Sequence, residues 1–92
     1  MIEVEVKVVG MFGAQFVTVA KKIQLIDGAG PKEAVTALYK SGAIDADVYQ
    51  RLKNLKPPYF IVLNDQTCEG KPQTIKLKNG DSMSVVQLMA GG

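Results

Sequence analysis

The sequence predicts an α+β fold in which a mixed sheet of four to five strands is crossed by one helix and accompanied by a short second helix. Three observations lead to this fold class. Residues 2–9 alternate between apolar and charged side chains, as a half-buried strand does. Residues 31–41 carry apolar side chains at helical spacing. Two further apolar segments, 59–63 and 83–89, have the length of strands.

The first two strands are expected to form a hairpin. The apolar face of residues 2–9 consists of Ile2, Val4, Val6 and Val8. Residues 10–14 supply turn chemistry, and residues 16–26 give a second strand. Its apolar face consists of Val17, Val19, Ile23 and Leu25. Lys21 falls on this face, which indicates either a bulge or a lysine that reaches solvent from the strand end.

The crossover helix has clear boundary signals. Residues 27–30 form a loop, and Pro31 suits the first helical position. The helix should end near Ser41, with Gly42 as the residue that follows its C-terminus. The apolar stripe consists of Ala34, Val35, Leu38 and Tyr39.

Residues 43–58 are expected to form the short second helix. Asp45 can cap its N-terminus. Val48, Leu52 and Leu55 lie on one side of it, and Arg51, Lys53 and Lys56 make the segment basic. This basic side fits either a solvated helix face or a surface that selects a partner. Pro57-Pro58 prevents the helix from continuing.

The C-terminal half adds the remaining strands. Tyr59 to Leu63 is apolar on both faces, and residues 64–66 start a turn. Cys68 is placed in a polar loop, 66–73, before a short strand at 74–77 and a hairpin turn at Asn79-Gly80. In the last strand, Met83, Val85, Gln87 and Met89 point one way, whereas Ser84, Val86 and Leu88 point the other. This order of elements gives a β-grasp architecture, with the first and last strands parallel and adjacent in the middle.

Composition excludes several classes of function. The chain of 92 residues is expected to be one domain, residues 1–89, followed by a flexible tail, residues 90–92. Cys68 is the single cysteine and histidine is absent, so an iron–sulfur carrier and cysteine-rich or histidine-rich metal sites are excluded. Gly28-Ala29-Gly30 lacks the Gly-Lys-Ser/Thr ending of a phosphate-binding loop.

Charge and hydropathy set the expected location and partners. The net charge of +2 is too small to predict a nucleic-acid partner. No apolar run approaches the roughly 20 residues that span a bilayer, and the N-terminus has no signal-peptide pattern. We therefore expect a cytoplasmic protein with no membrane partner.

The tail Ala90-Gly91-Gly92 is the strongest candidate site. Two glycines make a thin thread that can enter a narrow channel, and the Gly92 carboxylate is unhindered. A chance Gly-Gly or a trimmed end is the simpler interpretation. The more specific interpretation is that the C-terminus is the reactive group and that Val86 and Leu88 form a docking surface beside it.

This ending resembles that of the MoaD/ThiS family of ubiquitin-like sulfur carriers, in which a Gly-Asp turn and a short strand precede a terminal Gly-Gly. Here these are Gly80-Asp81 and Ala90-Gly91-Gly92. Residues 60–65, an apolar strand that ends in an Asn turn, also resemble the family. So does the first strand with its turn at Phe12, residues 8–14, which favours the MoaD branch.

The resemblance implies a carrier rather than an enzyme, with no catalytic residue and no cofactor of its own. An adenylating enzyme of the ubiquitin-activating type would hold ATP and magnesium and adenylate Gly92, with Gly91 and Ala90 giving access. A thiocarboxylate at Gly92 would then serve the large subunit of a synthase in molybdopterin or tungstopterin biosynthesis, or, with weaker support, thiamine thiazole biosynthesis. Two alternatives stay open: a ubiquitin-like modifier conjugated through Gly92, and a β-grasp binding module that makes no use of its tail.

Overall fold

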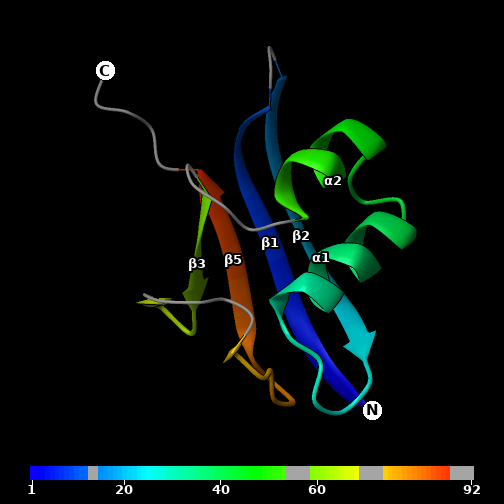
Figure 1. The fold of residues 1–92 in the computed structure, drawn as a ribbon, viewed down its shortest axis with the longest axis vertical. Helices are drawn as coiled ribbons and strands as arrows, with labels where there is room; N and C mark the ends of the chain where they lie inside the picture. Colours follow the sequence, from blue (N-terminus) through cyan, green and yellow to red (C-terminus); the bar gives the residue numbers. More distant parts are fainter. Residues whose placement is uncertain (13–14, 54–58, 69–73, 88–92) are drawn as a thin grey trace.

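The computed structural model describes residues 1–12, 15–53, 59–68 and 74–87. These residues include two helices and five strands, joined by turns and loops (Figure 1). In chain order they are β1 (Ile2–Phe12), β2 (Gln15–Leu25), α1 (Pro31–Lys40), α2 (Ala46–Leu52), β3 (Tyr59–Leu63), β4 (Gln66–Cys68) and β5 (Ser82–Gln87). The expected α+β fold class is confirmed.

One mixed sheet joins all five strands in the order β2-β1-β5-β3-β4. The first and last strands run parallel and adjacent, with Val6 opposite Met83 and Val8 opposite Val85. β5 lies between β1 and β3 and is therefore buried in the sheet, as its apolar residues on both faces predict. The β-grasp arrangement is confirmed.

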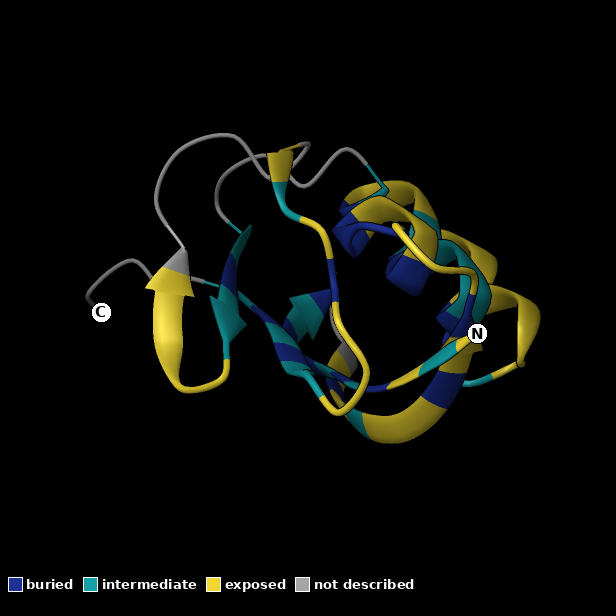
Figure 2. Cartoon of the chain, turned by 90° about the horizontal axis from the view of Figure 1, so that it is seen from below, coloured by how far each residue is buried: buried dark blue, intermediate teal, exposed yellow. Residues whose placement is uncertain are grey.

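Both helices pack on the same face of the sheet, and the core lies between the two layers (Figures 1 and 2). Val4, Val6 and Val8 of β1 are fully buried there. From α1, Ala34, Val35 and Leu38 are fully buried too. The expected stripe was wrong about Tyr39, which is 36% exposed and stacks on Tyr49 of α2 with ring centroids 4.5 Å apart. The tyrosine pair thus joins the two helices at the edge of the core.

The helix boundaries follow the expected signals. Pro31 begins α1, and Gly42 lies just past its end with φ of 86°. Asp45 caps α2, because its carboxylate accepts a hydrogen bond of 2.9 Å from the Val48 N–H. Val48 and Leu52 are buried against the core. Leu55, Lys56 and Pro57-Pro58 lie outside the described residues.

Four local predictions were wrong. Gln66–Cys68 pairs with β3 as a strand instead of starting a loop. Residues 75–78 form no strand, although Leu77 is buried and its N–H donates to the Ala29 carbonyl. Asn79-Gly80 is therefore a turn without a hairpin, and the antiparallel partner of β5 is β3. The turn expected at residues 10–14 begins later, because β1 and β2 pair without interruption past residue 9 to Phe12. Of the two interpretations of Lys21, the bulge is excluded, whereas its exposure agrees with a lysine that reaches solvent, although it lies in the middle of β2.

The β3–β4 hairpin depends on two residues in the left-handed region. Asn64 and Asp65 have φ of 50° and 67°. Asn64 also ties this hairpin to β5, because its side chain accepts from the Ser82 N–H and donates to the Asp81 carboxylate. The Asp65 side chain makes no hydrogen bond or ion pair with any residue that the structure describes.

These two positions should respond oppositely to glycine. Asp65→Gly is expected to raise the free energy of unfolding by about 0.5 kcal/mol, because glycine adopts positive φ without a steric penalty. Asn64→Gly should lower it by about 1 kcal/mol through lost hydrogen bonds. Urea unfolding of the two variants measures both changes. Stabilisation by both substitutions would contradict the structural role given to the Asn64 side chain.

Candidate functional site

The tail expected to carry the chemistry begins where the described chain ends. Leu88, Ala90, Gly91 and Gly92 lie outside the described residues, and so does Met89. Gln87, the last residue of β5, is the last that the structure describes (Figure 1). Within the described residues, the candidate site is therefore the base from which the tail departs, together with the sheet face beside it.

A close backbone approach fixes the end of β5 against β1. A Cβ added at Gly10 would come within 2.7 Å of the Gln87 Cβ, closer than side-chain carbons pack. Gly10 does not have positive φ, so its glycine is required by space rather than by backbone conformation. This position lies one residue beyond Val9, which pairs with Val86 at the end of the β1–β5 register.

The Gln87 side chain then occupies the next bonding position on β1. The Met11 N–H donates to Gln87 Oε1 over 2.5 Å, in the place where continued parallel pairing would use the main-chain carbonyl of Gln87. Because a side chain accepts the hydrogen bond of the Met11 N–H, this N–H does not need a main-chain acceptor from β5. The pairing of β5 with β1 accordingly ends at Val86, immediately before the tail.

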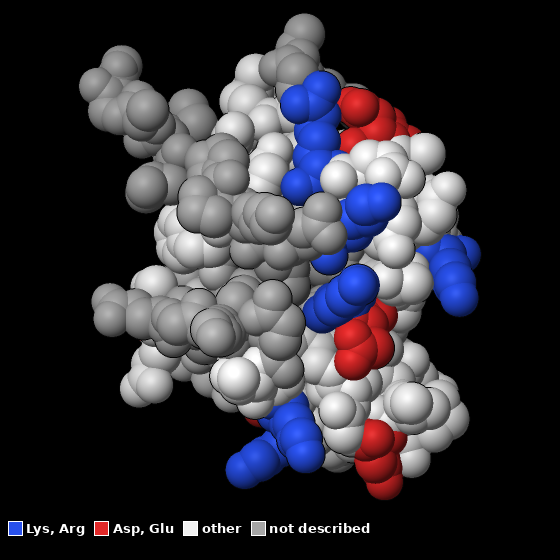
Figure 3. Space-filling view, viewed as in Figure 1, with Lys and Arg blue, Asp and Glu red and all other residues white. Residues whose placement is uncertain are grey.

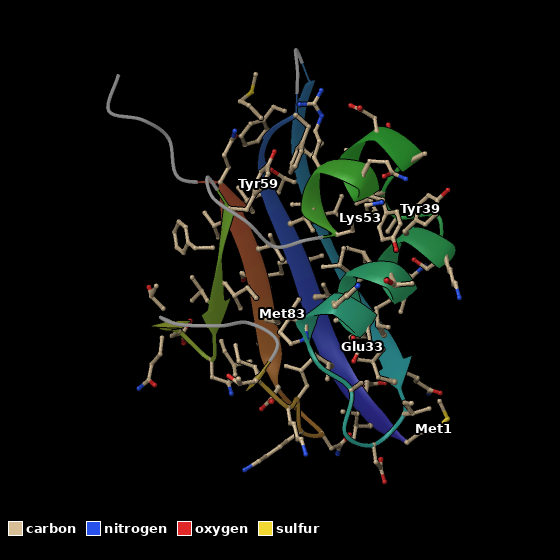
Figure 4. All side chains as sticks on the ribbon, viewed as in Figure 1. Met1, Glu33, Tyr39, Lys53, Tyr59 and Met83 are labelled. Carbon is tan, nitrogen blue, oxygen red and sulfur yellow. The ribbon has the colours of Figure 1, made fainter. Side chains whose placement is uncertain are left out.

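Two stacked rings support this end of the sheet. Phe12 is 2% exposed, and its ring lies 5.3 Å from that of Tyr59 at an interplanar angle of 8°. Tyr59, labelled in Figure 4, begins β3, and in the register it pairs with Gln87 of β5. Phe12, expected in a turn, is thus the last residue of β1. We call Gly10, Met11, Phe12, Tyr59 and Gln87 the tail root.

An apolar patch adjoins the tail root on the sheet face opposite the helices. Val9, Val86 and Phe60 stand side by side across β1, β5 and β3, and each is half-buried. We call these three residues the outer-face patch. Val86 therefore lies where the sequence placed it, facing away from the helices. Its role in docking stays a prediction, and its expected neighbour Leu88 is outside the described residues.

The charges around these features are mixed in sign. Lys7 Nζ lies 3.4 Å from Glu5 Oε1, and in the register Lys7 stands opposite Ser84, two residues before the outer-face patch. On the helix side, lysine and arginine are interspersed with aspartate and glutamate (Figure 3). Arg51 forms an ion pair with Asp47, with 3.2 Å between Arg51 Nε and Asp47 Oδ2. This mixture does not make an extended single-sign surface on the described helix side.

The described residues also limit other kinds of site. Among residues 1–12, 15–53, 59–68 and 74–87, no three His, Cys, Asp or Glu side chains gather where they could ligate a metal ion. Within the same residues, neither helix has the length and apolar character needed to traverse a bilayer.

The sequence interpretation missed the tail root. It identified Gly10 only as turn chemistry and Gln87 only as one member of a strand face. A glycine inside an alternating strand often marks a close approach of another backbone, and that signal was available at Gly10. The partner of the approach was not, because it lies 77 residues further along the chain.

Comparisons with known proteins agree with this fold. No protein-family model matches the sequence, and no curated protein matches it. A solved structure that is similar is a complex of subunits 1 and 2 of molybdopterin-converting factor from Helicobacter pylori 26695. The TM-score to its matching chain is 0.57, with 21% identity over 99% of this chain and 100% of that chain.

A second similar structure is the solution structure of the HVO 2177 protein of Haloferax volcanii. Its TM-score is 0.60, with 19% identity over 99% of this chain and 87% of that one. At such identities the similarity establishes the fold. The β-grasp fold, with a molybdopterin-converting factor subunit among its structural neighbours, is consistent with the MoaD/ThiS resemblance of the sequence.

Proposed function

We propose that this chain is a sulfur carrier whose Gly92 carboxylate is converted to a thiocarboxylate. A carboxylate oxygen attacks the α-phosphate of ATP in the active site of an adenylating enzyme, which releases pyrophosphate and leaves an acyl-adenylate. A sulfur nucleophile then attacks the Gly92 carbonyl carbon and displaces AMP. Adenylation replaces an oxide, which is a poor leaving group, by AMP. ATP and magnesium are held by the partner enzyme, so this chain acts as a co-substrate.

The observation that carries the proposal is the way the fold ends. β5 is held on both sides by β1 and β3 up to Val86. Gln87 then closes the last bonding position on β1, and a terminal Gly-Gly follows within five residues. A rigid body with a thin C-terminal extension can be docked by its surface while the extension enters a separate active site.

The proposed destination of the sulfur is a molybdopterin or tungstopterin precursor. Support comes from the Phe12 segment in the sequence and from the fold shared with a subunit of molybdopterin-converting factor, which was solved as a complex with a second subunit. A synthase large subunit is therefore the proposed acceptor. Thiazole delivery is the second destination, carried by the general MoaD/ThiS resemblance alone.

Intact-mass measurement tests the proposal. The full chain is incubated with ATP, magnesium, a candidate adenylating enzyme of the ubiquitin-activating type and a sulfide source. The expected product is heavier by the difference between one sulfur and one oxygen atom, and C-terminal peptide mapping places the change at Gly92. Formation of an isopeptide with lysines of other proteins, without a thiocarboxylate, would instead assign the chain as a protein modifier. An unchanged mass with every activating enzyme would favour the binding module.

The outer-face patch should contribute to partner docking. Val86→Ala is expected to weaken binding of the adenylating enzyme about tenfold, because docking on the outer-face patch would bury the two methyl groups that the substitution removes. Ser84→Ala is the matched control: Ser84 lies on the same strand and face, two residues earlier, and should change binding less than about twofold. Calorimetric titration measures both. Equal effects of the two substitutions would remove Val86 from the interface.

A further inference from the structure

The free edge of β2 is the longest unpaired edge that the structure describes. β2 forms one border of the sheet, and its 11 residues pair with β1 without a break. The other border, β4, has three residues. A long regular edge presents a row of backbone donors and acceptors that can pair with another extended chain. The side chains and charges beside this edge determine which kind of extended chain could pair with it.

The hydrogen bonds of β1 reveal which β2 residues face outward. The N–H groups of Glu3 and Glu5 bond toward the β5 side, to Asn79 Oδ1 and the Asp81 carbonyl. The alternate residues of β1 therefore bond β2. Because the two residues of a bonded antiparallel pair exchange both bonds, their partners in β2 are the odd-numbered residues. The outward N–H and C=O groups belong to Phe16, Thr18, Ala20, Lys22 and Gln24.

A groove runs beside the first half of this edge. It has a volume of about 220 Å³ and lies between β2 and the segment that leads into α2. Its walls include Val17, Ile44 and Val48, which are 8%, 5% and 2% exposed and so belong to the packed core. Phe16, which also lines the groove, is 61% exposed. The apolar side chains of an added strand could enter this groove while its backbone pairs with β2.

Lys21 sets the charge of the edge. It lies in the middle of β2 on the same face as Val17 and Val19, is exposed, and makes no ion pair within the described part of the chain. Lys22 follows on the opposite face, across from Glu5 in the register. A lysine directed toward the covered face of an edge strand opposes pairing with a like strand, because a second β2 would bring its own two lysines to the same edge. An occupant with negative charge opposite Lys21 would complement this charge. Asp45 lies at the groove, so the acidic residue belongs at the Lys21 end.

We infer that the β2 edge binds an extended segment of a partner protein. An acidic residue of that segment stands opposite Lys21, and apolar residues at the next two alternate positions stand opposite Val19 and Val17. Main-chain pairing supplies affinity, and the groove and Lys21 supply specificity. This surface is on the opposite border of the sheet from β4, and β1 lies between it and β5, the last described strand. The inference makes no use of thiocarboxylate chemistry.

The test is a titration of the isotope-labelled full chain with synthetic peptides, followed by NMR. One probe is acetyl-Glu-Glu-Thr-Val-Thr-Val-Thr-amide, which suits antiparallel addition, and the second is its reversed sequence, which suits parallel addition. Saturable binding of one of them is expected, with shifts confined to residues 16–24 and 43–48. The matched control replaces both glutamates by lysine and should bind at least about tenfold more weakly.

Two variants of the protein sharpen the result. Lys21→Glu should reverse the preference between the acidic and lysine peptides. Ala20→Pro removes an outward N–H without breaking a bond to β1, so it should abolish binding while the far-UV circular dichroism is retained. The inference is overturned if neither peptide direction binds up to millimolar concentration, or if charge reversal leaves the preference unchanged. Shifts elsewhere on the sheet, or self-association through the same edge, would also overturn it.

Discussion

Deletion of Gly91 and Gly92 is expected to reduce thiocarboxylate formation below detection and to leave the folded body unchanged. The reactive carbonyl would then belong to Ala90, two residues closer to the sheet. Reach matters because the carboxylate must meet the α-phosphate of ATP in line, and a misplacement of about 1 Å can cost a hundredfold in rate. Stability should not change, since two glycines carry no side chain to bury and the core of the described residues runs from Val4 to Val85.

Two measurements separate these effects. Intact mass after incubation with the adenylating enzyme and sulfide reports the chemistry, and thermal unfolding reports the body. Deletion of Gly92 alone is the stricter variant, because it keeps a glycine carboxylate at the terminus and changes only the reach. The truncated chains should still bind the adenylating enzyme through the outer-face patch and compete with the full chain. A truncated chain that retains full activity in cells would remove the tail from the mechanism and favour a binding module.

The long elements of this fold could be predicted from sequence because each carries a strong periodic or terminal signal. The alternation of Val4, Val6 and Val8 predicts the face that is fully buried. Pro31 and Gly42 bracket α1 as expected. Asp45 caps α2 through the hydrogen bond that such residues commonly make. In each case the determining interactions are local in the chain.

The errors occur where tertiary contacts override local propensity. Residues 74–77 have a strand-like composition, but Leu77 is held by the Ala29 carbonyl beside α1 rather than by a neighbouring strand. The hairpin that Asn79-Gly80 suggested did not form, because β5 finds its partners in β1 and β3. Tyr39 follows the helical apolar spacing, yet its ring stacks on Tyr49 at the border of the core.

The candidate site also has one part that local sequence predicts and one part that depends on tertiary contacts. The chemical expectation for Ala90, Gly91 and Gly92 comes from residue type alone, and so does the outward placement of Val86. The tail root could not be predicted from the sequence, because Gly10 and Met11 meet Gln87 only after the sheet has formed. A glycine inside a strand indicates that another segment approaches closely, but it does not identify that segment. Local sequence rules therefore predict a reactive C-terminus, and they miss the contacts that hold the end of β5.

Gly10→Ala is expected to lower the free energy of unfolding by about 2 kcal/mol, because the new Cβ overpacks a filled site. The methyl group would lie within 2.7 Å of the Gln87 Cβ and 3.1 Å of Gln87 Oε1, so the end of β5 has to move. The same movement displaces the base of the tail. We therefore also expect the rate of thiocarboxylate formation, measured where the variant is fully folded, to fall about tenfold.

Gln87→Gly provides the matched background for this substitution. On its own it should cost about 1–2 kcal/mol, because the Met11 N–H loses its acceptor and a glycine is placed in a strand. In the Gln87→Gly background, however, position 87 has no Cβ, so a Cβ at position 10 has lost the atom with which it would clash. The cost of Gly10→Ala should then drop to less than about 0.5 kcal/mol, a coupling that a double-mutant cycle in urea measures directly. If the two costs simply add, the close contact is not what requires glycine at position 10, and the tail root does not hold the last strand in the way proposed.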